Sequence, residues 1–404
     1  MYFSKHIRRA LSLALVAMMV VACGGGGGSG ASTSTPPTAE NVLSVTVDSG
    51  PNGNAVNTLY AAVTICQPGS TTNCQTIDHV LVDTGSTGLR LLSGVIASGL
   101  NLSRTTSSSG GTLLNCAHFL DSSFAWGPVV TVDMLLGGKK AAAVPIQLIA
   151  DPASNHLAAR CSSGDALNSV ATLGAKGILG IGLFKEDCGA GCASNADNGV
   201  YYRCTDGACS AAVASTASTS QQLKNPVPLF ASDNNGLMVD LPAVASSGAA
   251  SLNGSVVFGI ATQSNNQFTA GTVLKTSTGH FTTLFAGQSL NKGFLDTGSN
   301  ALFFNSSAIP SCGTEASGFY CPSTRTQLSA TLFDGNAAST AVTFSIDNAL
   351  ALFNIGNSAL PTLSGPVGDA QTFDWGLPFF YGRRVFIGIE QLPSPAGPGP
   401  FYAF

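Results

Sequence analysis

The sequence predicts a mostly β fold, built from two β-rich lobes with a cleft between them. Short runs rich in Val, Ile, Thr and Phe recur between clusters of Gly, Asn, Asp and Ser, and long helical periodicity is scarce. The 404 residues include 47 glycines and only 9% charged side chains, which suits a turn-rich, exported chain. One four-residue motif occurs twice at long range, which favours one copy in each of two lobes.

The composition also excludes several classes of protein. Hydrophobic residues make up 44% of the chain, enough for a sizeable core, so a disordered protein is not expected. The 17 basic and 21 acidic residues give a formal net charge of −4 without a basic stripe. We therefore expect no nucleic-acid partner.

The N-terminus has the pattern of an export signal. Three basic residues precede an apolar run over residues 10–21 that is short for a membrane span. The sequence Val-Val-Ala-Cys that ends at Cys23 resembles a bacterial lipobox, which implies a signal peptide over residues 1–22 and lipidation of Cys23. Gly24 follows, which in such lipoproteins implies an outer-membrane anchor in the cell envelope. The alternative is a plain signal peptide with an incidental cysteine.

The rest of the chain divides into three parts. Residues 23–41 are of low complexity, rich in Gly, Ser, Thr and Pro, and are predicted to be a flexible tether. We expect an N-terminal lobe over residues 42–262 and a C-terminal lobe over residues 263–404, each with one copy of the repeated motif.

The cysteines predict a disulfide framework. Of 11 cysteines, all but Cys23 are left for pairing, an even number that allows up to five bridges in an exported protein. Short spacings favour one bridge near each end of the chain, and a third could join two cysteines of the first lobe. The pairing of the remaining four stays open, and a zinc site there is the less favoured alternative. The two favoured bridges are Cys66 with Cys74 and Cys312 with Cys321, and the possible third bridge is Cys116 with Cys161. The four cysteines whose pairing stays open are Cys188, Cys192, Cys204 and Cys209.

The repeated motif is Asp-Thr-Gly-Ser. Residues 80–86 read VLVDTGS and residues 293–299 read GFLDTGS, and each copy is followed by a second apolar segment. The aspartates, Asp83 and Asp296, are 213 residues apart. A single Asp-Thr-Gly is a common turn, but two copies after apolar strands at this spacing are far more specific.

Each residue type in the motif has a physical role. A buried aspartate at a strand end is costly unless hydrogen bonds stabilise its charge. The following glycine lets backbone amides approach the carboxylate closely. The serine hydroxyl can donate to the outer carboxylate oxygen, and the threonine can fasten one loop to the other. These supporting residues are Thr84, Gly85, Ser86, Thr297, Gly298 and Ser299.

Two such loops placed face to face would give an acid–base pair. Like charges at close range cannot both ionise easily, so the two carboxyl groups share a proton. One carboxylate can then take a proton from water while the other donates one to a carbonyl oxygen. This is general acid–base hydrolysis of an amide without a covalent intermediate.

The motif pair resembles the pepsin-like aspartic peptidases, and other landmarks agree in order. Residues 177–182 and 375–380 are similar to the apolar strand that the family places beneath each catalytic loop, and residues 384–389 form a suitable final strand. The resemblance implies a pepsin-like acid protease fold and an aspartic endopeptidase with Asp83 and Asp296 as catalytic residues. It implies a peptide substrate bound extended in the cleft, no metal or organic cofactor, and a monomer. The chain also resembles a proteobacterial lipoprotein family of unknown function.

The sequence departs from the family in three places, and the last two of these motivate a second hypothesis. Asp374 stands where an aliphatic residue is usual, and a cysteine-rich insertion covers residues 185–212. The stretch expected to form the flap over the cleft, residues 118–127, has no tyrosine, and Trp126 or Phe119 would have to replace it. The second hypothesis is a catalytically silent, pepsin-fold binding module of the envelope or surface, and a third is a structural envelope protein.

Overall fold

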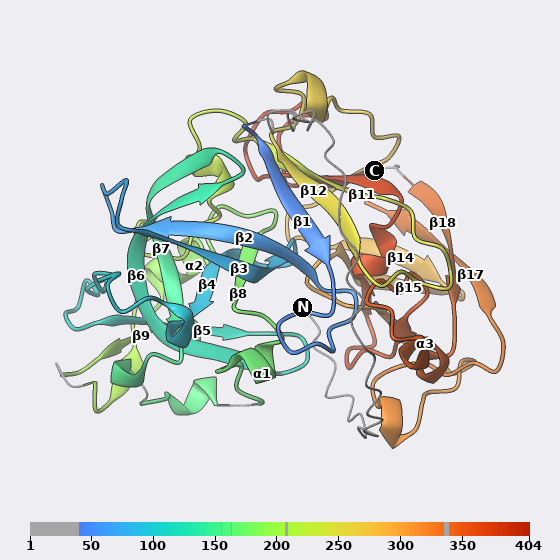
Figure 1. Cartoon of the computed structure of the whole chain (residues 1–404), viewed down its shortest axis with the longest axis horizontal. Coiled ribbons are helices and arrows are strands. Elements are labelled where there is room, and N and C mark those ends of the chain that lie inside the picture. The colour runs from blue at the N-terminus through green and yellow to red at the C-terminus, as the bar shows by residue number, and fades with distance from the viewer. Residues whose placement is uncertain (1–39, 155, 163, 207–208, 335–338) are drawn as a thin grey trace, which may run out of the picture.

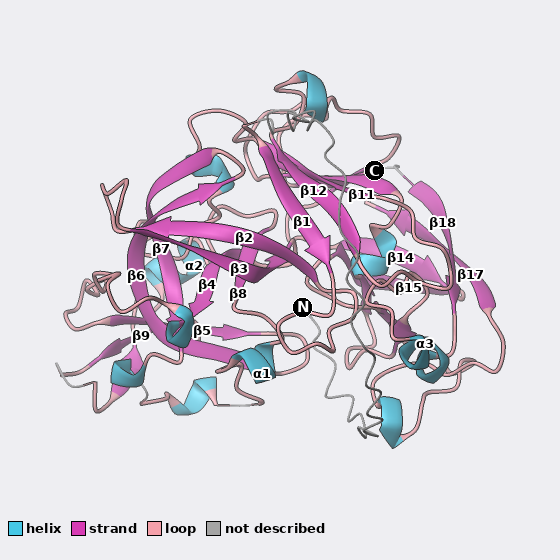
Figure 2. Ribbon diagram, in the orientation of Figure 1, coloured by secondary structure: helices cyan, strands magenta, loops and turns pink. Residues whose placement is uncertain are grey.

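The computed structural model describes residues 40–154, 156–162, 164–206, 209–334 and 339–404. These residues form 22 strands and three short α-helices, α1 (Val170–Leu173), α2 (Ala190–Ser194) and α3 (Ala349–Ile355), so the predicted mostly β class is confirmed (Figure 2). The predicted signal peptide, the lipidation site Cys23 and nearly all of the tether lie outside the described residues. Among the described residues, no helix is long and apolar enough to cross a membrane.

The strands form two sheets (Figure 1). The larger sheet has 15 strands in the spatial order β10 (Ala212–Ala214), β9 (Tyr201–Cys204), β5 (Leu113–His118), β6 (Phe124–Leu136), β7 (Lys139–Ile149), β4 (Thr87–Leu92), β8 (Gly177–Ile181), β3 (Cys74–Asp83), β2 (Leu59–Cys66), β1 (Val42–Val47), β12 (Leu252–Phe258), β11 (Gly236–Leu241), β21 (Arg383–Gly388), β22 (Phe401–Ala403) and β13 (Val273–Lys275). The smaller sheet has seven, in the order β18 (Ser339–Ile346), β17 (Thr326–Phe333), β14 (Phe281–Phe285), β15 (Gln288–Leu295), β20 (Thr372–Trp375), β16 (Leu302–Phe304) and β19 (Ser364–Gly365).

The two Asp-Thr-Gly-Ser loops lie in equivalent topological positions in these sheets. In the larger sheet the first loop joins β3 to β4, and β8 pairs parallel with β3 and antiparallel with β4. In the smaller sheet the second loop joins β15 to β16, and β20 pairs parallel with β15 and antiparallel with β16. The sequence repeat is therefore also a structural repeat, and each loop is fixed by three paired strands.

Both loops are anchored in apolar cores. Val82, which precedes the first aspartate, is fully buried together with Leu179 of β8. Trp375 of β20 is also fully buried, and its ring stacks on Phe373 with a centroid distance of 4.2 Å. Side chains of both sheets belong to one hydrophobic cluster, so the ends of β3 and β15 have little freedom to move apart.

Two segments that the sequence analysis singled out have a different structure from the one expected. Strand β6 begins at Phe124, inside the stretch 118–127 that was expected to form the flap. Gly127 lets β6 pass close to the backbone of β7. A Cβ at this position would lie 1.8 Å from the carbonyl oxygen of Leu148, so only glycine allows this close approach. The landmark at residues 375–380 is a strand only as far as Trp375, since Leu377–Phe379 is a 3-10 helix.

The disulfide prediction is confirmed. The structure contains the two bridges that the short spacings favoured, Cys66–Cys74 and Cys312–Cys321, and the possible third bridge, Cys116–Cys161. The cluster, whose pairing the sequence left open, forms Cys188–Cys192 and Cys204–Cys209. The four cysteines of the cluster are thus disulfide-bonded and do not form the alternative zinc site.

We expect the bridges to differ in their effect on stability. Cys116–Cys161 spans 45 residues and Cys188–Cys192 spans four. Loop-closure entropy then predicts that replacing both cysteines with serine lowers the free energy of unfolding by about 4 kcal/mol for the long bridge and roughly 2 kcal/mol for the short one. Urea denaturation of the two double variants measures this difference, and equal losses would contradict the prediction.

Candidate active site

The two aspartates of the repeated motif are brought together at the ends of β3 and β15. Asp83 and Asp296 are both completely buried, and their carboxyl groups hydrogen-bond to each other. Each carboxylate also accepts a hydrogen bond from the glycine amide of its own loop, 2.8 Å from Gly85 N to Asp83 Oδ1 and 2.7 Å from Gly298 N to Asp296 Oδ1. The predicted carboxyl pair is therefore present in the structure.

The glycines of the motif are required by space. A Cβ at Gly298 would lie 2.6 Å from Asp83 Oδ1, and a Cβ at Gly85 would lie 2.7 Å from Asp296 Cγ. Real Cβ atoms do not approach heavy atoms this closely, so each glycine admits the carboxyl group of the opposite loop. The two loops thus interlock at their glycines.

The threonines fasten the loops to each other by a symmetrical exchange. The Thr84 amide donates to Thr297 Oγ1 at 3.1 Å, and the Thr297 amide donates to Thr84 Oγ1 at 3.0 Å. Each hydroxyl then donates across to the opposite strand, Thr84 to the Leu295 carbonyl at 3.3 Å and Thr297 to the Val82 carbonyl at 2.8 Å. All four hydrogen bonds are buried, as the role predicted for these threonines requires.

This exchange makes a specific prediction for a threonine variant. In Thr297→Val the buried Thr84 amide loses its acceptor, and we expect a loss of about 1–3 kcal/mol in the free energy of unfolding. Thr362→Val is the matched control, because among the described residues the buried Thr362 hydroxyl has no hydrogen-bond partner. Denaturation curves of the two variants test the prediction, which fails if both lose the same stability.

The serines hold the outer carboxylate oxygens, but the two sides differ. The Ser86 hydroxyl donates to Asp83 Oδ2. The Ser299 hydroxyl lies 3.0 Å from Asp296 Oδ2 and also 2.6 Å from Oδ2 of a third buried carboxyl group, Asp374 on β20. The sequence identified Asp374 only as a departure from the expected pattern, and the structure places it beside the carboxyl pair.

The environment separates the two pKa values of the carboxyl pair. Burial and the charge of Asp296 raise the pKa of Asp83 to about 7. Burial acts to raise the pKa of Asp296, whereas hydrogen bonds from Asp83 and from the Gly298 amide act to lower it. Below its pKa of about 7, Asp83 carries the shared proton, and the hydrogen bonds to Asp296 favour the negative charge there, which is the division of roles that acid–base catalysis needs.

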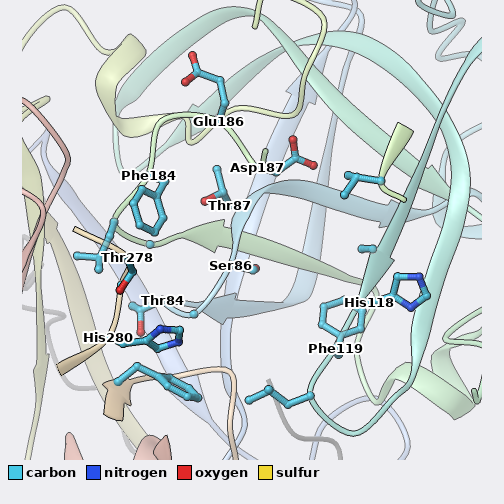
Figure 3. A pocket seen from close by; sticks show the side chains of 18 of the residues that line it. Thr84, Ser86, Thr87, His118, Phe119, Phe184, Glu186, Asp187, Thr278 and His280 are labelled. Carbon is cyan, nitrogen blue, oxygen red and sulfur yellow. The ribbon is translucent and has the colours of Figure 1, made fainter. Parts of the chain in front are cut away.

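A cavity of about 530 Å³ opens beside the first loop (Figure 3). Ser86 lies between two walls: His118 and Phe119 on one side, and Phe184, Thr278 and His280 on the other. The cavity reaches Gly85, which is exposed and behind which the Asp296 carboxyl group lies. Residues of both predicted lobes therefore line one cavity next to the carboxyl pair.

A second buried ionic group lines the cavity and was not predicted. Asp187 accepts hydrogen bonds from Tyr201 at 2.6 Å, from Asn115 at 3.1 Å and from Arg90 at 3.4 Å. Burial raises the pKa of Asp187 to about 6, against the opposing effect of the Arg90 charge. The predicted insertion at residues 185–212 supplies both Asp187 and Tyr201, so it forms part of the cavity wall.

The turn expected to act as a flap is the hairpin turn between β5 and β6. Phe119 lines the cavity, as one of the two suggested replacements for a flap tyrosine would. Trp126, the other suggestion, is buried away from the cavity: it packs against Tyr202, and its Nε1 donates to the Ser154 carbonyl at 2.9 Å. The two residues differ because Phe119 lies in the turn after β5, whereas Trp126 lies within β6.

The described residues offer one cluster with the composition of a metal site, Cys116, Cys161 and His118. The two cysteines are joined in a disulfide, and His118 Nε2 lies 3.2 Å from Cys116 Sγ. A thiolate is required to bind a metal ion, so this cluster does not form a metal site while the bridge is intact.

The sheets and loops define this chain as a mostly β protein with a buried site of paired aspartates. The chain belongs to the family described as "Protein of unknown function (DUF3443)", whose model matches residues 37–404. No curated protein matches the chain. Because the family carries no assigned function, any function has to be argued from the geometry of the site.

Proposed function

We propose that this protein is an aspartic endopeptidase with a bilobal, pepsin-like fold. The observation that carries the proposal is the contact between the buried carboxyl groups of Asp83 and Asp296, held by two interlocked Asp-Thr-Gly-Ser loops. The topological repeat of β3, β4 and β8 in β15, β16 and β20 supports the two-lobed fold. The cavity between Phe119 and His280 would receive an extended peptide.

The proposed reaction uses only water and the carboxyl pair. Asp296 accepts a proton from water as the water oxygen bonds to the peptide carbonyl carbon, and Asp83 donates its proton to the carbonyl oxygen. The tetrahedral intermediate then returns a hydroxyl proton to Asp83. Asp296 gives its proton to the amide nitrogen as the C–N bond breaks. Both carboxyl groups end in their starting protonation states.

Cleavage of a diverse peptide library by the purified protein tests this proposal. We expect cleavage in mildly acidic solution, inhibition by pepstatin, and loss of activity in Asp296→Asn. Folded protein that cleaves nothing at any pH, or cleavage that persists in Asp296→Asn, would contradict the proposal.

A second candidate function is binding without catalysis, as an envelope or surface module. Two features of the cavity favour it: the hairpin turn over the cavity has Phe119 and no tyrosine, and the insertion at residues 185–212 supplies part of the wall. The same library distinguishes the two functions: an endopeptidase releases fragments, whereas a binding module retains intact peptides.

We also propose that the chain is exported and anchored to the outer membrane through a lipid on Cys23. The lipobox-like sequence ending at Cys23 and the five disulfide bridges support an envelope location. Metabolic labelling with a radioactive fatty acid should mark the wild-type protein and not Cys23→Ser. Equal labelling of both would contradict the anchor.

A further inference from the structure

The side chain of Asp374 lies in a position that the first half of the structural repeat fills with an apolar residue. In the register of the smaller sheet, Asp374 stands opposite Phe294 on β15 and Phe303 on β16. In the larger sheet the equivalent residue of β8 is Ile178, opposite Leu81 and Arg90. Asp374 and Ile178 are both completely buried, so the carboxyl group is an addition to one side of the site only.

The Ser299 hydroxyl has a single proton, and this limits which of its two carboxyl neighbours can be ionised. The Ser299 Oγ lies within hydrogen-bond distance of carboxylate oxygens of both Asp296 and Asp374, at 3.0 and 2.6 Å. A serine hydroxyl has one proton and can donate to only one of them. The other contact is a hydrogen bond only if that carboxyl group is protonated and donates to Ser299 Oγ.

The surroundings indicate that Asp374 is the protonated partner. Among the described residues, Asp374 Oδ1 has no hydrogen-bond partner, and its cross-strand neighbours are phenylalanines. An ionised carboxylate with an unpaired oxygen in such a place is very costly. Asp296, in contrast, accepts hydrogen bonds from the Gly298 amide and from Asp83, which stabilise its charge.

The other titratable groups near Asp374 agree with this assignment. Burial and the charge of Asp296 raise the pKa of Asp374 well above its usual range, and Asp83 adds to the effect. Tyr402 on β22 is also close, and burial raises its pKa too, so it stays neutral and donates to the Gly279 carbonyl at 3.1 Å. Asp296 is then the one ionised group in this cluster of four.

We infer that Asp374 is a positioning residue that stays protonated and, through Ser299, holds Asp296 as the ionised member of the carboxyl pair. The chain of donors runs from Asp374 Oδ2 to Ser299 Oγ and from Ser299 Oγ to Asp296 Oδ2. Aligned donors strengthen one another, so the Asp296 carboxylate is stabilised. Asp296 thereby becomes the base and Asp83 the acid. This inference deepens the proposed peptidase function, and its consequence for the pH profile rests on that function.

Two substitutions with different expected results test the inference. In Asp374→Asn the amide Nδ2 can still donate to Ser299 Oγ, so we expect the acidic limb of the pH profile of kcat/KM to stay in place. Asp374→Ile copies the residue of the other half-site and removes the donor. We expect its acidic limb to move toward neutral pH by about half a pH unit or more, because the Asp296 carboxylate is less stabilised. Ile178→Val is the control and should leave the limb unchanged.

The directions of the shifts decide between the interpretations. An ionised Asp374 would repel the charge of Asp296, so both Asp374→Asn and Asp374→Ile would move the acidic limb to lower pH and overturn the inference. Unchanged limbs in both folded variants would reduce Asp374 to a structural role and also overturn it.

A measurement without substrate separates this inference from the peptidase proposal. The infrared difference spectrum of wild type minus Asp374→Asn at pH 8 should contain the C=O stretch of a protonated carboxyl group. Its absence, with the antisymmetric stretch of a carboxylate in its place, would overturn the inference whether or not the protein cleaves peptides. If the protonated band is present and no peptide is cleaved, only the proposed function fails.

Discussion

Replacing either aspartate of the carboxyl pair with asparagine should lower kcat/KM for peptide cleavage by about 10³-fold or more. Asn has the shape of Asp but can neither accept a proton from water nor supply one to a carbonyl oxygen. Asp369→Asn is the matched control, since Asp369 lies at the surface in an ion pair with Lys292. Equal rates in wild type, Asp83→Asn and Asp296→Asn would contradict a two-aspartate mechanism.

The same pair sets the expected pH dependence of activity. Asp83 has to be protonated to act as the acid, and its pKa is raised to about 7, so kcat/KM should fall as the pH rises through about 7. Asp296 has to be ionised, and hydrogen bonds from Asp83 and from the Gly298 amide favour its charged form, so the acidic limb should lie well below the pKa of Asp83. An activity profile that rises continuously above pH 7 would contradict this assignment.

Stability should follow the raised pKa of Asp83 in a defined direction. A carboxyl group whose pKa is higher in the folded than in the unfolded protein binds its proton more tightly when folded. Asp83 therefore makes the free energy of unfolding fall as the pH rises from about 4 to about 7. Asp83→Asn removes this loss, so at pH 8 the variant should be at least as stable as the wild type in urea denaturation.

The carboxyl pair could be predicted from sequence because its information is local. Four consecutive residues supply the aspartate, its amide donor, its hydroxyl donor and the bridging threonine, and the second copy supplies the partner. The isolated cysteine pairs of short spacing, Cys66–Cys74 and Cys312–Cys321, were predictable for the same reason. Within each loop and each such cysteine pair, the short spacing keeps the interacting residues close along the chain, whereas the contact between the two loops was predicted from the repetition of the motif.

The rest of the site depends on long-range pairing that no short motif records. Asp374 reaches Ser299 only because β20 lies between β15 and β16, and its one signal in the sequence is an acidic residue inside an apolar run. Arg90 and Asp187 are 97 residues apart. Their types alone do not distinguish a buried ion pair from two solvated charges.

The second large effect is expected from a single methyl group at the meeting point of the loops. In Gly298→Ala the new Cβ would lie 2.6 Å from Asp83 Oδ1 and 3.0 Å from Asp296 Oδ1, so at least one carboxyl group has to move. Misplacing reacting groups by about 1 Å costs on the order of 10²-fold in rate, and overpacking a buried site costs about 1–3 kcal/mol of stability. We expect both losses in this variant.

Gly85→Ala should behave in the same way from the opposite side, because its Cβ would lie 2.7 Å from Asp296 Cγ. Gly368→Ala is the matched control, since a Cβ there would have no atom within 4 Å. Steady-state kinetics and urea denaturation of the three variants separate crowding at the site from the general effect of replacing glycine. If Gly298→Ala and Gly85→Ala keep the kcat/KM of Gly368→Ala, the carboxyl groups do not need their present separation, and the acid–base pair loses its geometric basis.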